Sequence, residues 1–329
     1  MIRIIMDAFG GDNAPAAVVA GAALALNRFN DITITLCGRE DAVRAELQKH
    51  SFDAQRMAVL DASEVIDCHE APTLAIKRKK DSSLVKSLAA VANGEADCVV
   101  SAGSTGALLT GATLIVRRMK GVKRPALAPL LPTHTGGWLM LIDCGANADC
   151  KPSYLQQFAV MGSAYMKGVM GLESPRVGLL NNGAEAEKGN ELTKTAYPLI
   201  QAAPVNFAGN CEARDILSGN YDVLVCDGFS GNVVLKYTEG LSATILAMLK
   251  EELMADPRAK LGALLAKPAF RRMKKKMDYT EHGGAPLLGV NGGDAKAFCS
   301  AVMQARRFAQ ADVNGAISAA ITALPVVED

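Results

Sequence analysis

Residues 96–109 read ADCVVSAGSTGALL, and residues 221–234 read YDVLVCDGFSGNVV. Both stretches place an Asp before an apolar run, end that run in a Gly-x-x-Gly turn and continue into apolar residues typical of a helix start. The repeat predicts the same strand–turn–helix unit twice. Gly in such a turn lets the backbone approach a ligand, and the first N–H groups of the following helix favour an anion. Each turn is therefore a candidate phosphate site, although Gly and Ser are also common in turns that bind nothing.

The rest of the chain extends this alternation of strand and helix. Short runs rich in Val, Ile and Leu are typical of buried strands, and they occur at residues 2–6, 32–37, 97–101, 138–142, 176–180 and 222–226. Helical spacing is found at residues 14–28, 39–49, 82–93, 105–119, 153–170, 188–203 and 230–254. The pattern predicts an α/β fold with a mostly parallel sheet covered by helices on both faces.

Composition excludes several classes of protein. The formal net charge of +1 predicts no global attraction to nucleic acid. The N-terminus lacks the pattern of a signal peptide, and the apolar stretch at 14–26 is too short to cross a bilayer, so a cytoplasmic protein is expected. The eight cysteines include no CxxC pair, and we expect reduced, mostly buried thiols, Cys144 among them, with no metal site. Neither a P-loop nor a dinucleotide fingerprint is present, and no cofactor is expected.

A basic tract lies at residues 258–276, where eight basic residues and no acidic one are interleaved with apolar residues. Pro268 is expected to divide the tract into two short helices. Its charged residues form a candidate docking surface for an acidic protein or an anionic membrane. They are Arg258, Lys260, Lys267, Arg271, Arg272, Lys274, Lys275 and Lys276. The alternative is a solvated helix hairpin whose long side chains cover apolar surface.

A series of motifs gives the chain a family resemblance. They read MDAFGGDNAP, DSSLVKSL, SAGSTGALL, GVKRPALAPLLPT, DCGANADCKPSYLQQFAVMG, PRVGLLNNG with KGNEL, CDGFSGNVVLKYTEG and GGAPLLGVNG. In order, from about residue 1 to 292, they closely resemble the bacterial acyl-ACP:phosphate acyltransferases of phospholipid synthesis, the PlsX family. The resemblance implies a three-layer α/β/α fold similar to isocitrate and isopropylmalate dehydrogenases and to phosphate acetyltransferase. We expect one such domain over residues 1–329, with a protruding basic amphipathic helical segment at about 241–282.

The resemblance also implies a reaction and its partners. A long-chain acyl group would pass from acyl carrier protein to inorganic phosphate, and the acyl phosphate would go to a glycerol-3-phosphate acyltransferase for phosphatidic acid synthesis. The family is usually homodimeric, and transient contact with the membrane surface is expected. Both anion-binding turns and the basic tract agree with these substrates.

Phosphate is itself a competent nucleophile, so the site has to position it and stabilise the oxygen that becomes negative. The candidate catalytic residues are Lys188, Asn190 and Asn232. The candidate phosphate-binding residues are Asp7, Gly10, Gly11, Asp12, Gly103, Ser104, Thr105, Gly106, Asn147, Asp149, Asn182, Asn210 and Asp227. Any one of the polar residues could instead cap a helix or shape a turn.

Two alternatives remain open at this point. The family has a His-Gly pair after the GGAPLLGVNG strand, whereas this chain reads GGDAKAFCS, which motivates a scaffold that binds membrane or carrier protein without turnover. The second alternative is an NAD-dependent decarboxylating dehydrogenase. It would need a divalent metal held by residues such as Asp143, Asp222 and Asp227.

Overall fold

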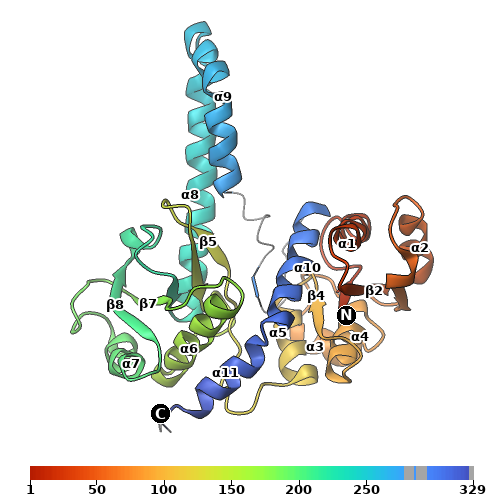
Figure 1. Cartoon of the computed structure of the whole chain (residues 1–329), viewed down its shortest axis with the longest axis horizontal. Helices are drawn as coiled ribbons and strands as arrows, with labels where there is room; N and C mark the ends of the chain where they lie inside the picture. Colours follow the sequence, from red (N-terminus) through yellow and green to blue (C-terminus); the bar gives the residue numbers. More distant parts are fainter. Residues whose placement is uncertain (278–284, 287–294, 326–329) are drawn as a thin grey trace.

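In the computed structural model, which describes residues 1–277, 285–286 and 295–325, the strands form two mostly parallel sheets. The first sheet has the order β3-β2-β1-β4 and the second the order β5-β6-β9-β7-β8. Figure 1 shows the two sheets in separate halves of the body, with the C-terminal helices α10 and α11 running between them. The mostly parallel α/β architecture is as predicted, although it is divided over two sheets.

The first sheet contains β1 (Ile2–Asp7), β2 (Ile32–Gly38), β3 (Met57–Asp61) and β4 (Cys98–Val100). In this sheet, β1, β2 and β4 are mostly buried, and the edge strand β3 is partly exposed. All of them are parallel, and Met6 of β1 is in register with Leu36 of β2 and with Val100 of β4. Because the strands are parallel, the loops that follow β1 and β4 emerge at the same edge of the sheet.

The second sheet is parallel except for its first strand. It contains β5 (Leu130–Pro132), β6 (Trp138–Ile142), β7 (Arg176–Asn181), β8 (Asn206–Glu212) and β9 (Val223–Val225). Strand β5 is antiparallel to β6, and the other pairs are parallel. Ile142 and Leu179 both lie opposite Val225, so the carboxyl ends of β6, β7 and β9 also share one edge.

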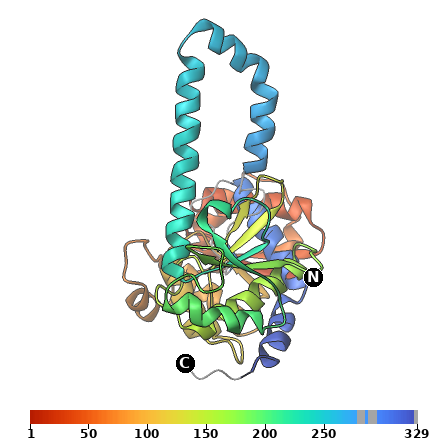
Figure 2. The ribbon, with the colours of Figure 1, turned by 90° about the vertical axis from the view of Figure 1, so that its left-hand side faces the viewer.

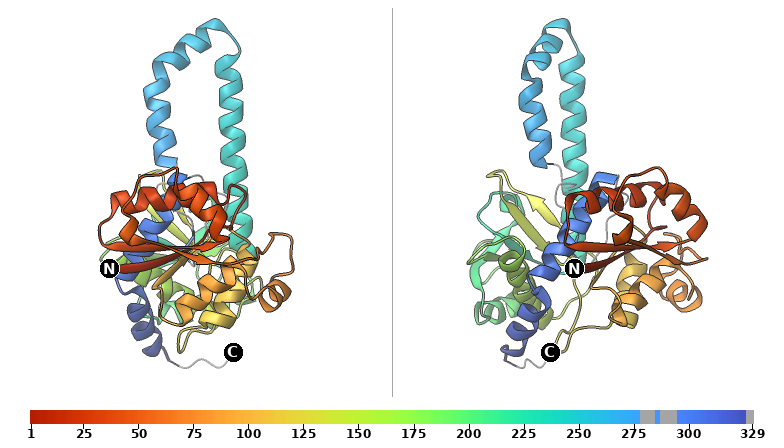
Figure 3. Two further views of the ribbon diagram at one scale, coloured as in Figure 1. Left: turned by 90° about the vertical axis from the view of Figure 1, so that its right-hand side faces the viewer. Right: turned by 45° about the vertical axis from the view of Figure 1, so that its right-hand side comes forward.

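Helices cover both faces of each sheet. They are α1 (Ala16–Arg28), α2 (Glu40–Leu47), α3 (Pro72–Arg78), α4 (Ser83–Ala92), α5 (Thr105–Gly111), α6 (Pro152–Gly168), α7 (Glu191–Gln201), α8 (Gly228–Met254), α9 (Pro257–Met277), α10 (Ala295–Gln310) and α11 (Val313–Thr322), with a π-helical turn at Ala112–Val116 and 3₁₀ turns at Ala54–Arg56 and Ala213–Asp215. Alternate residues of a strand enter different cores: Ile4 and Met6 pack with α1 and α10, and Ile5 packs with α4 and α5. Figure 3 shows this layering around the first sheet.

Helices α8 and α9 form a hairpin that projects from the body (Figure 2). Of the 27 residues of α8, the buried ones are Gly228 and Gly231, at its base. The expectation that Pro268 divides the basic tract is wrong, because α9 continues through Pro268 as one helix. A proline removes one helical hydrogen bond, and the turns on either side of Pro268 keep theirs.

The cysteines behave as the sequence indicates. All eight are free, and most are buried, including Cys37, Cys98, Cys144 and Cys226. Burial raises the pKa of the Cys37 and Cys98 thiols to about 12 and that of Cys144 further, so these thiols stay protonated at neutral pH.

Candidate active site

The first group of predicted residues surrounds the end of β1. Asp7 is buried, and its carboxylate accepts hydrogen bonds from Ser83 Oγ at 2.6 Å and from Ser101 Oγ at 2.7 Å. Gly10 lies so close to the next loop that an added Cβ would be 2.7 Å from Gly103 N. Burial raises the pKa of the Asp7 carboxyl, while the hydrogen bonds from the two serines act in the opposite direction. The loop after β1 and the loop after β4 therefore form one packed unit.

The turn between β4 and α5 follows the predicted strand–turn–helix pattern. Ser104 caps α5, since its Oγ accepts a hydrogen bond from Ala107 N at 3.3 Å. Gly103 N donates to Ser101 Oγ at 3.1 Å, so this N–H is used within the protein. Ser104, Thr105 and Gly106 are half-buried, and Gly11 and Asp12 lie in the neighbouring loop with increasing exposure.

A second group gathers at the end of β6. Asp143 is fully buried, and its carboxylate accepts hydrogen bonds from Leu127 N at 2.9 Å, Ala146 N at 3.2 Å and Asn147 N at 2.7 Å. The Asn147 side chain donates to the same carboxylate at 2.9 Å and to Pro125 O at 2.8 Å. Burial raises the pKa of Asp143, and these hydrogen bonds oppose the rise. Asp149 lies in the same loop and is exposed.

The turn between β9 and α8 completes this second group. Asp227 caps α8 by accepting hydrogen bonds from Ser230 N at 2.8 Å and Ser230 Oγ at 2.7 Å. Gly228 N donates to Asn147 O at 2.8 Å, and a Cβ on Gly231 would lie 1.9 Å from Asp143 O. The exposed Asn232 borders Gly145.

The third group is the loop between β7 and α7, which contains Lys188 and Asn190. Asn190 caps α7 through a hydrogen bond from Thr193 N at 2.9 Å, and Lys188 and Asn182 are exposed. Asn210 anchors the loop, because its Nδ2 donates to Glu185 O at 2.7 Å. The buried Asn210 Oδ1 has no hydrogen-bond partner within the part of the chain that the structure describes.

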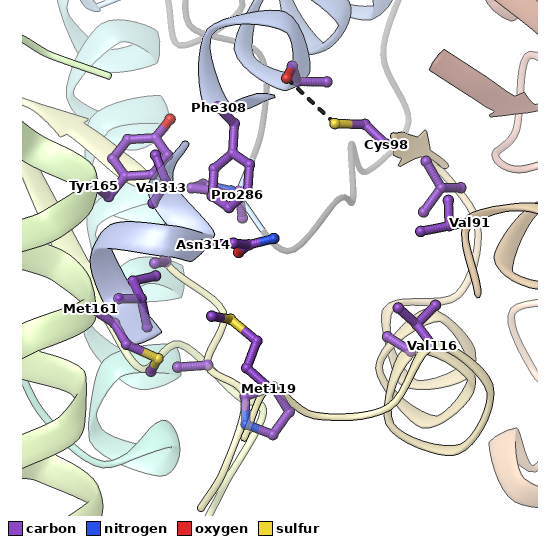
Figure 4. Close-up of a pocket in the computed structure, with 18 of the residues that line it drawn as sticks. Val91, Cys98, Val116, Met119, Met161, Tyr165, Pro286, Phe308, Val313 and Asn314 are labelled. Atoms are coloured by element: carbon purple, nitrogen blue, oxygen red, sulfur yellow. Dashed lines mark hydrogen bonds between the residues drawn. The ribbon is translucent and has the colours of Figure 1, made fainter. Parts of the chain in front are cut away.

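An apolar cavity of about 280 Å³ lies between the two halves (Figure 4). Val100 and Ile142 line it, and they are the last residues of β4 and β6. The next residues along the chain are Ser101 and Asp143, which hold the first and second polar groups. The cavity therefore extends to the residues directly before both groups, although Ser101 and Asp143 themselves do not line it. Its other walls come from α6, α10, α11 and the π-turn, with Met161, Phe308 and Val116 among the lining residues.

The basic tract extends along α9, the second helix of the hairpin, from its tip back toward the body (Figure 2). Arg258, Lys260, Lys267, Arg271 and Arg272 are exposed along α9. The side chains of Lys274, Lys275 and Lys276 lie outside the described residues, as does most of the GGAPLLGVNG segment. Within the described ranges, no group of three or more His, Cys, Asp or Glu residues is arranged to hold a metal ion. None of the helices in those ranges is long and apolar enough to span a bilayer.

Sequence reasoning missed the residues that hold the predicted ones in place. Ser83, Ser101 and Asp143 are buried hydrogen-bonding partners of the site loops, and none was predicted for the phosphate site. Asp143 was considered only as a metal ligand in the dehydrogenase alternative. Ser101 and Asp143 directly follow strands, which is a usable signal, whereas Ser83 comes from a helix 76 positions away from Asp7.

The fold belongs to the phosphotransacetylase class. The chain superposes on the EutD phosphotransacetylase from Staphylococcus aureus with a TM-score of 0.59 and 17% identity, and on a phosphotransacetylase from Streptococcus pyogenes with 0.59 and 18%, each covering 94% of both chains. Residues 2–324 match the family described as "Fatty acid synthesis protein". The chain is 52% identical to a phosphate acyltransferase of Clostridium perfringens (98% of this chain, 97% of the relative) and 51% identical to one of Clostridium novyi (93% and 95%). The chain belongs to this family, as the sequence motifs indicated.

Proposed function

We propose that the protein transfers a long-chain fatty acyl group from acyl carrier protein to inorganic phosphate. The observation that carries this proposal is a pair of polar groups that directly follow β4 and β6, two strands whose last residues, Val100 and Ile142, line one apolar cavity. The polar groups suit phosphate and a developing oxyanion, and the cavity suits a hydrocarbon chain. Relatives that cover nearly the whole chain are named phosphate acyltransferase, which agrees with this reaction.

The chemistry needs positioning more than a protein nucleophile. A phosphate oxygen would form a bond to the thioester carbonyl carbon, the carbon–sulfur bond would break, and the carrier thiol would leave after taking a proton. Ser104 and Thr105 would hold the phosphate, and Lys188, Asn190 and Asn232 would supply donors for the oxygen that becomes negative. Loss of one such donor typically lowers the rate by about a hundredfold to a thousandfold.

The cavity is the proposed place for the acyl chain. Replacing Val116, which lines the cavity, by Trp should lower the rate with a palmitoyl donor and spare an octanoyl donor, because the filled cavity no longer admits the longer chain. Leu114→Trp is the matched control, since Leu114 lies in the same π-helical turn, is 52% exposed and does not line the cavity. Equal losses for the two donors in Val116→Trp would refute this placement.

Helix α9 is the proposed docking surface for the acidic carrier protein. Its exposed Lys267 and Arg271 are one helical turn apart, so they present their charges on one face. Added salt should raise the KM for the carrier more than the KM for phosphate. Leu261, Leu264 and Leu265 are exposed at the start of the same helix and suit a transient contact with a membrane surface. The proposed location is therefore the cytoplasm, with peripheral association with the membrane.

A homodimer is the proposed assembly, because α8 carries an apolar stripe that its own chain leaves exposed. The stripe consists of Phe229, Val233, Tyr237, Leu241, Ile245 and Met248. Successive members are four residues apart, and the last two are three apart, so each side chain lies next to the following one and the stripe winds around the helix as it leaves the body. Large apolar surfaces of this kind mark contacts between proteins, and a second copy offers a surface of the same size and chemistry.

The decisive experiment incubates the purified protein with palmitoyl carrier protein and phosphate, and traps acyl phosphate with hydroxylamine. Phosphate-dependent hydroxamate is the expected result. A folded protein that binds the carrier without forming hydroxamate would favour the scaffold alternative. Magnesium-dependent reduction of NAD with a 2-hydroxy acid would favour the dehydrogenase. The expected product would feed glycerol-3-phosphate acylation on the way to phosphatidic acid.

A further inference from the structure

Asp7 lies at the centre of the first polar group, and its carboxylate faces buried side chains of the protein. It is the last residue of β1 and is 3% exposed. One carboxylate oxygen accepts from Ser83 Oγ at 2.6 Å, and the other accepts from Ser101 Oγ at 2.7 Å. The two serines are 2% and 1% exposed. Phe9 N also donates to the first oxygen at 3.3 Å, so each oxygen is bound by a protein donor and the carboxylate is shielded from solvent.

The two serines differ in what they hold. Ser101 passes the contact on, because its Oγ accepts from Gly103 N at 3.1 Å while donating to Asp7. Ser83 is the first residue of α4, and among the described residues its hydroxyl makes no hydrogen bond to the Gly103–Gly106 turn. The turn at Gly103 is thus tied to β1 through one hydroxyl, and α4 is tied to β1 through the other.

Close packing makes this arrangement rigid. A Cβ atom on Gly10 would lie 2.8 Å from Asp7 Oδ2 and 2.9 Å from Ser101 Oγ, so the β1 loop fills the space around the carboxylate. Burying a carboxylate is costly, and an apolar group of similar size would often stabilise the fold as well. The cost is understandable if the carboxylate fixes the geometry of the turn beside it.

We propose that Asp7 is a positioning residue, which acts through Ser101 on the Gly103–Gly106 turn and so sets where phosphate sits against the acyl carbonyl. The inference rests on the proposed function and assigns Asp7 a role other than direct phosphate binding. A misplacement of about 1 Å in a reacting group can cost roughly a hundredfold in rate. Loss of the Ser101 link should therefore affect catalysis far more than loss of the Ser83 link.

The test compares Ser101→Ala with Ser83→Ala. Both variants remove one buried hydroxyl from the same carboxylate, so both should lose a similar amount of stability, measured by urea unfolding. In the hydroxamate assay, Ser101→Ala should lower kcat/KM for phosphate by roughly thirtyfold or more, and Ser83→Ala by less than about fivefold. Losses that are equal in the two variants, or that follow the folded fraction, would overturn the proposal.

Two further measurements separate the role of Asp7 from the proposed reaction: the activity of Asp7→Asn and the effect of phosphate on the melting temperature. Asp7→Asn preserves the volume of the side chain but leaves one acceptor oxygen for the two serines, and it should resemble Ser101→Ala even if that variant folds poorly. The rise in melting temperature caused by added phosphate needs no turnover, and it should shrink in Ser101→Ala and persist in Ser83→Ala. An inactive wild type would refute the proposed function, whereas equal phosphate-induced shifts in the two serine variants would refute this inference.

Discussion

The unit that contains β4 and α5 and the unit that contains β9 and α8 begin alike and end differently. In each, an Asp before the strand pairs with the Arg that begins or nearly begins a neighbouring strand: Asp97 with Arg3, and Asp222 with Arg176. In each, a polar residue after the strand caps the helix. Helix α5 then packs into the core through Ala107 and Leu108, whereas only the base of α8, as far as Val234 and Leu235, packs against the body and the rest of the helix projects from it.

The turns also differ in charge. Ser104 caps α5 with a neutral hydroxyl, and Asp227 caps α8 with a carboxylate. Gly228 N is already bound to Asn147 O. Binding of phosphate is therefore less favourable beside α8 than beside α5, because the phosphate would meet the negative charge of Asp227. The repeated sequence pattern specifies the start of each helix, and the residues packed around each turn decide what the turn can bind.

The largest expected effect concerns the glycines of the two turns. Gly231→Ala would place a Cβ 1.9 Å from Asp143 O and should destabilise the protein by about 3 kcal/mol or more, because backbone has to move. The counterpart Gly103→Ala should cost less than about 1 kcal/mol, since its nearest neighbour, Ser101 Oγ, is 3.3 Å away. Urea unfolding measures both. Comparable losses would mean that the second turn is not packed as tightly as the structure has it.

The next effect concerns the exposed stripe of α8, which has no equivalent on α5. Ile245→Glu should raise the dimer dissociation constant by roughly a hundredfold, because Ile245 is 54% exposed and lies in the stripe. Ala243→Glu adds the same charge two residues away, on the opposite side of the helix, and should change dissociation much less. Sedimentation velocity over a range of concentrations measures both. A monomeric wild type, or equal effects of the two substitutions, would contradict the proposed interface.

The contrast between the two units also explains what the sequence could reveal. Strands β6 and β9 are continuous apolar runs, and β1 is apolar except for Arg3 and its last residue, Asp7, so the ends of these strands and the polar residues there could be predicted. Strand β8 reads NFAGNCE and β5 is three residues with a Pro, and both lie at sheet edges where burial leaves little pattern. Helix α9 continues through Pro268 although a break is the usual expectation.

The site was predictable only as far as local sequence reaches. Loops that follow parallel strands meet at one edge, and that rule identified Asp7, Ser104 and Asn147 as candidates. It could not identify Ser83, because its contact with Asp7 depends on how α4 packs against β1. It also could not separate a capping carboxylate such as Asp227 from a ligand-binding one, since both occupy the same place in the chain.

Exchanging the two caps should have an intermediate effect. Ser104→Asp keeps a good N-cap but brings a carboxylate to the first turn, and the KM for phosphate should rise roughly tenfold at low salt. Asp227→Ser removes the charge from the second turn, and the KM should change by less than about threefold. Steady-state assays at two ionic strengths measure both, and salt should reduce the Ser104→Asp effect. If the two variants raise the KM equally, both turns hold the phosphate.

The smallest expected effect concerns the two Asp–Arg pairs. Burial acts against the charged form of Asp222, but the hydrogen bonds from Arg176 outweigh it and hold the pKa below the ordinary value of 3.8; hydrogen bonds from Arg3 likewise lower the pKa of Asp97. Stability from a lowered carboxyl pKa is present above the unfolded value and is lost as pH falls through the folded one. At pH 7, Asp222→Asn should cost about 1 kcal/mol, a modest amount because Arg176 is 44% exposed.

Asp97→Asn should cost less than Asp222→Asn, because the Asp97 side chain is 35% exposed and that of Asp222 is 16% exposed. Below about pH 4, the difference between wild type and Asp222→Asn should shrink, since the wild-type carboxylate itself becomes protonated. Urea unfolding at pH 7 and at successively lower pH follows both variants. A difference that stays constant down to pH 3 would show that Asp222 acts through shape and neutral hydrogen bonds, and that the charge of the pair contributes nothing to the second sheet.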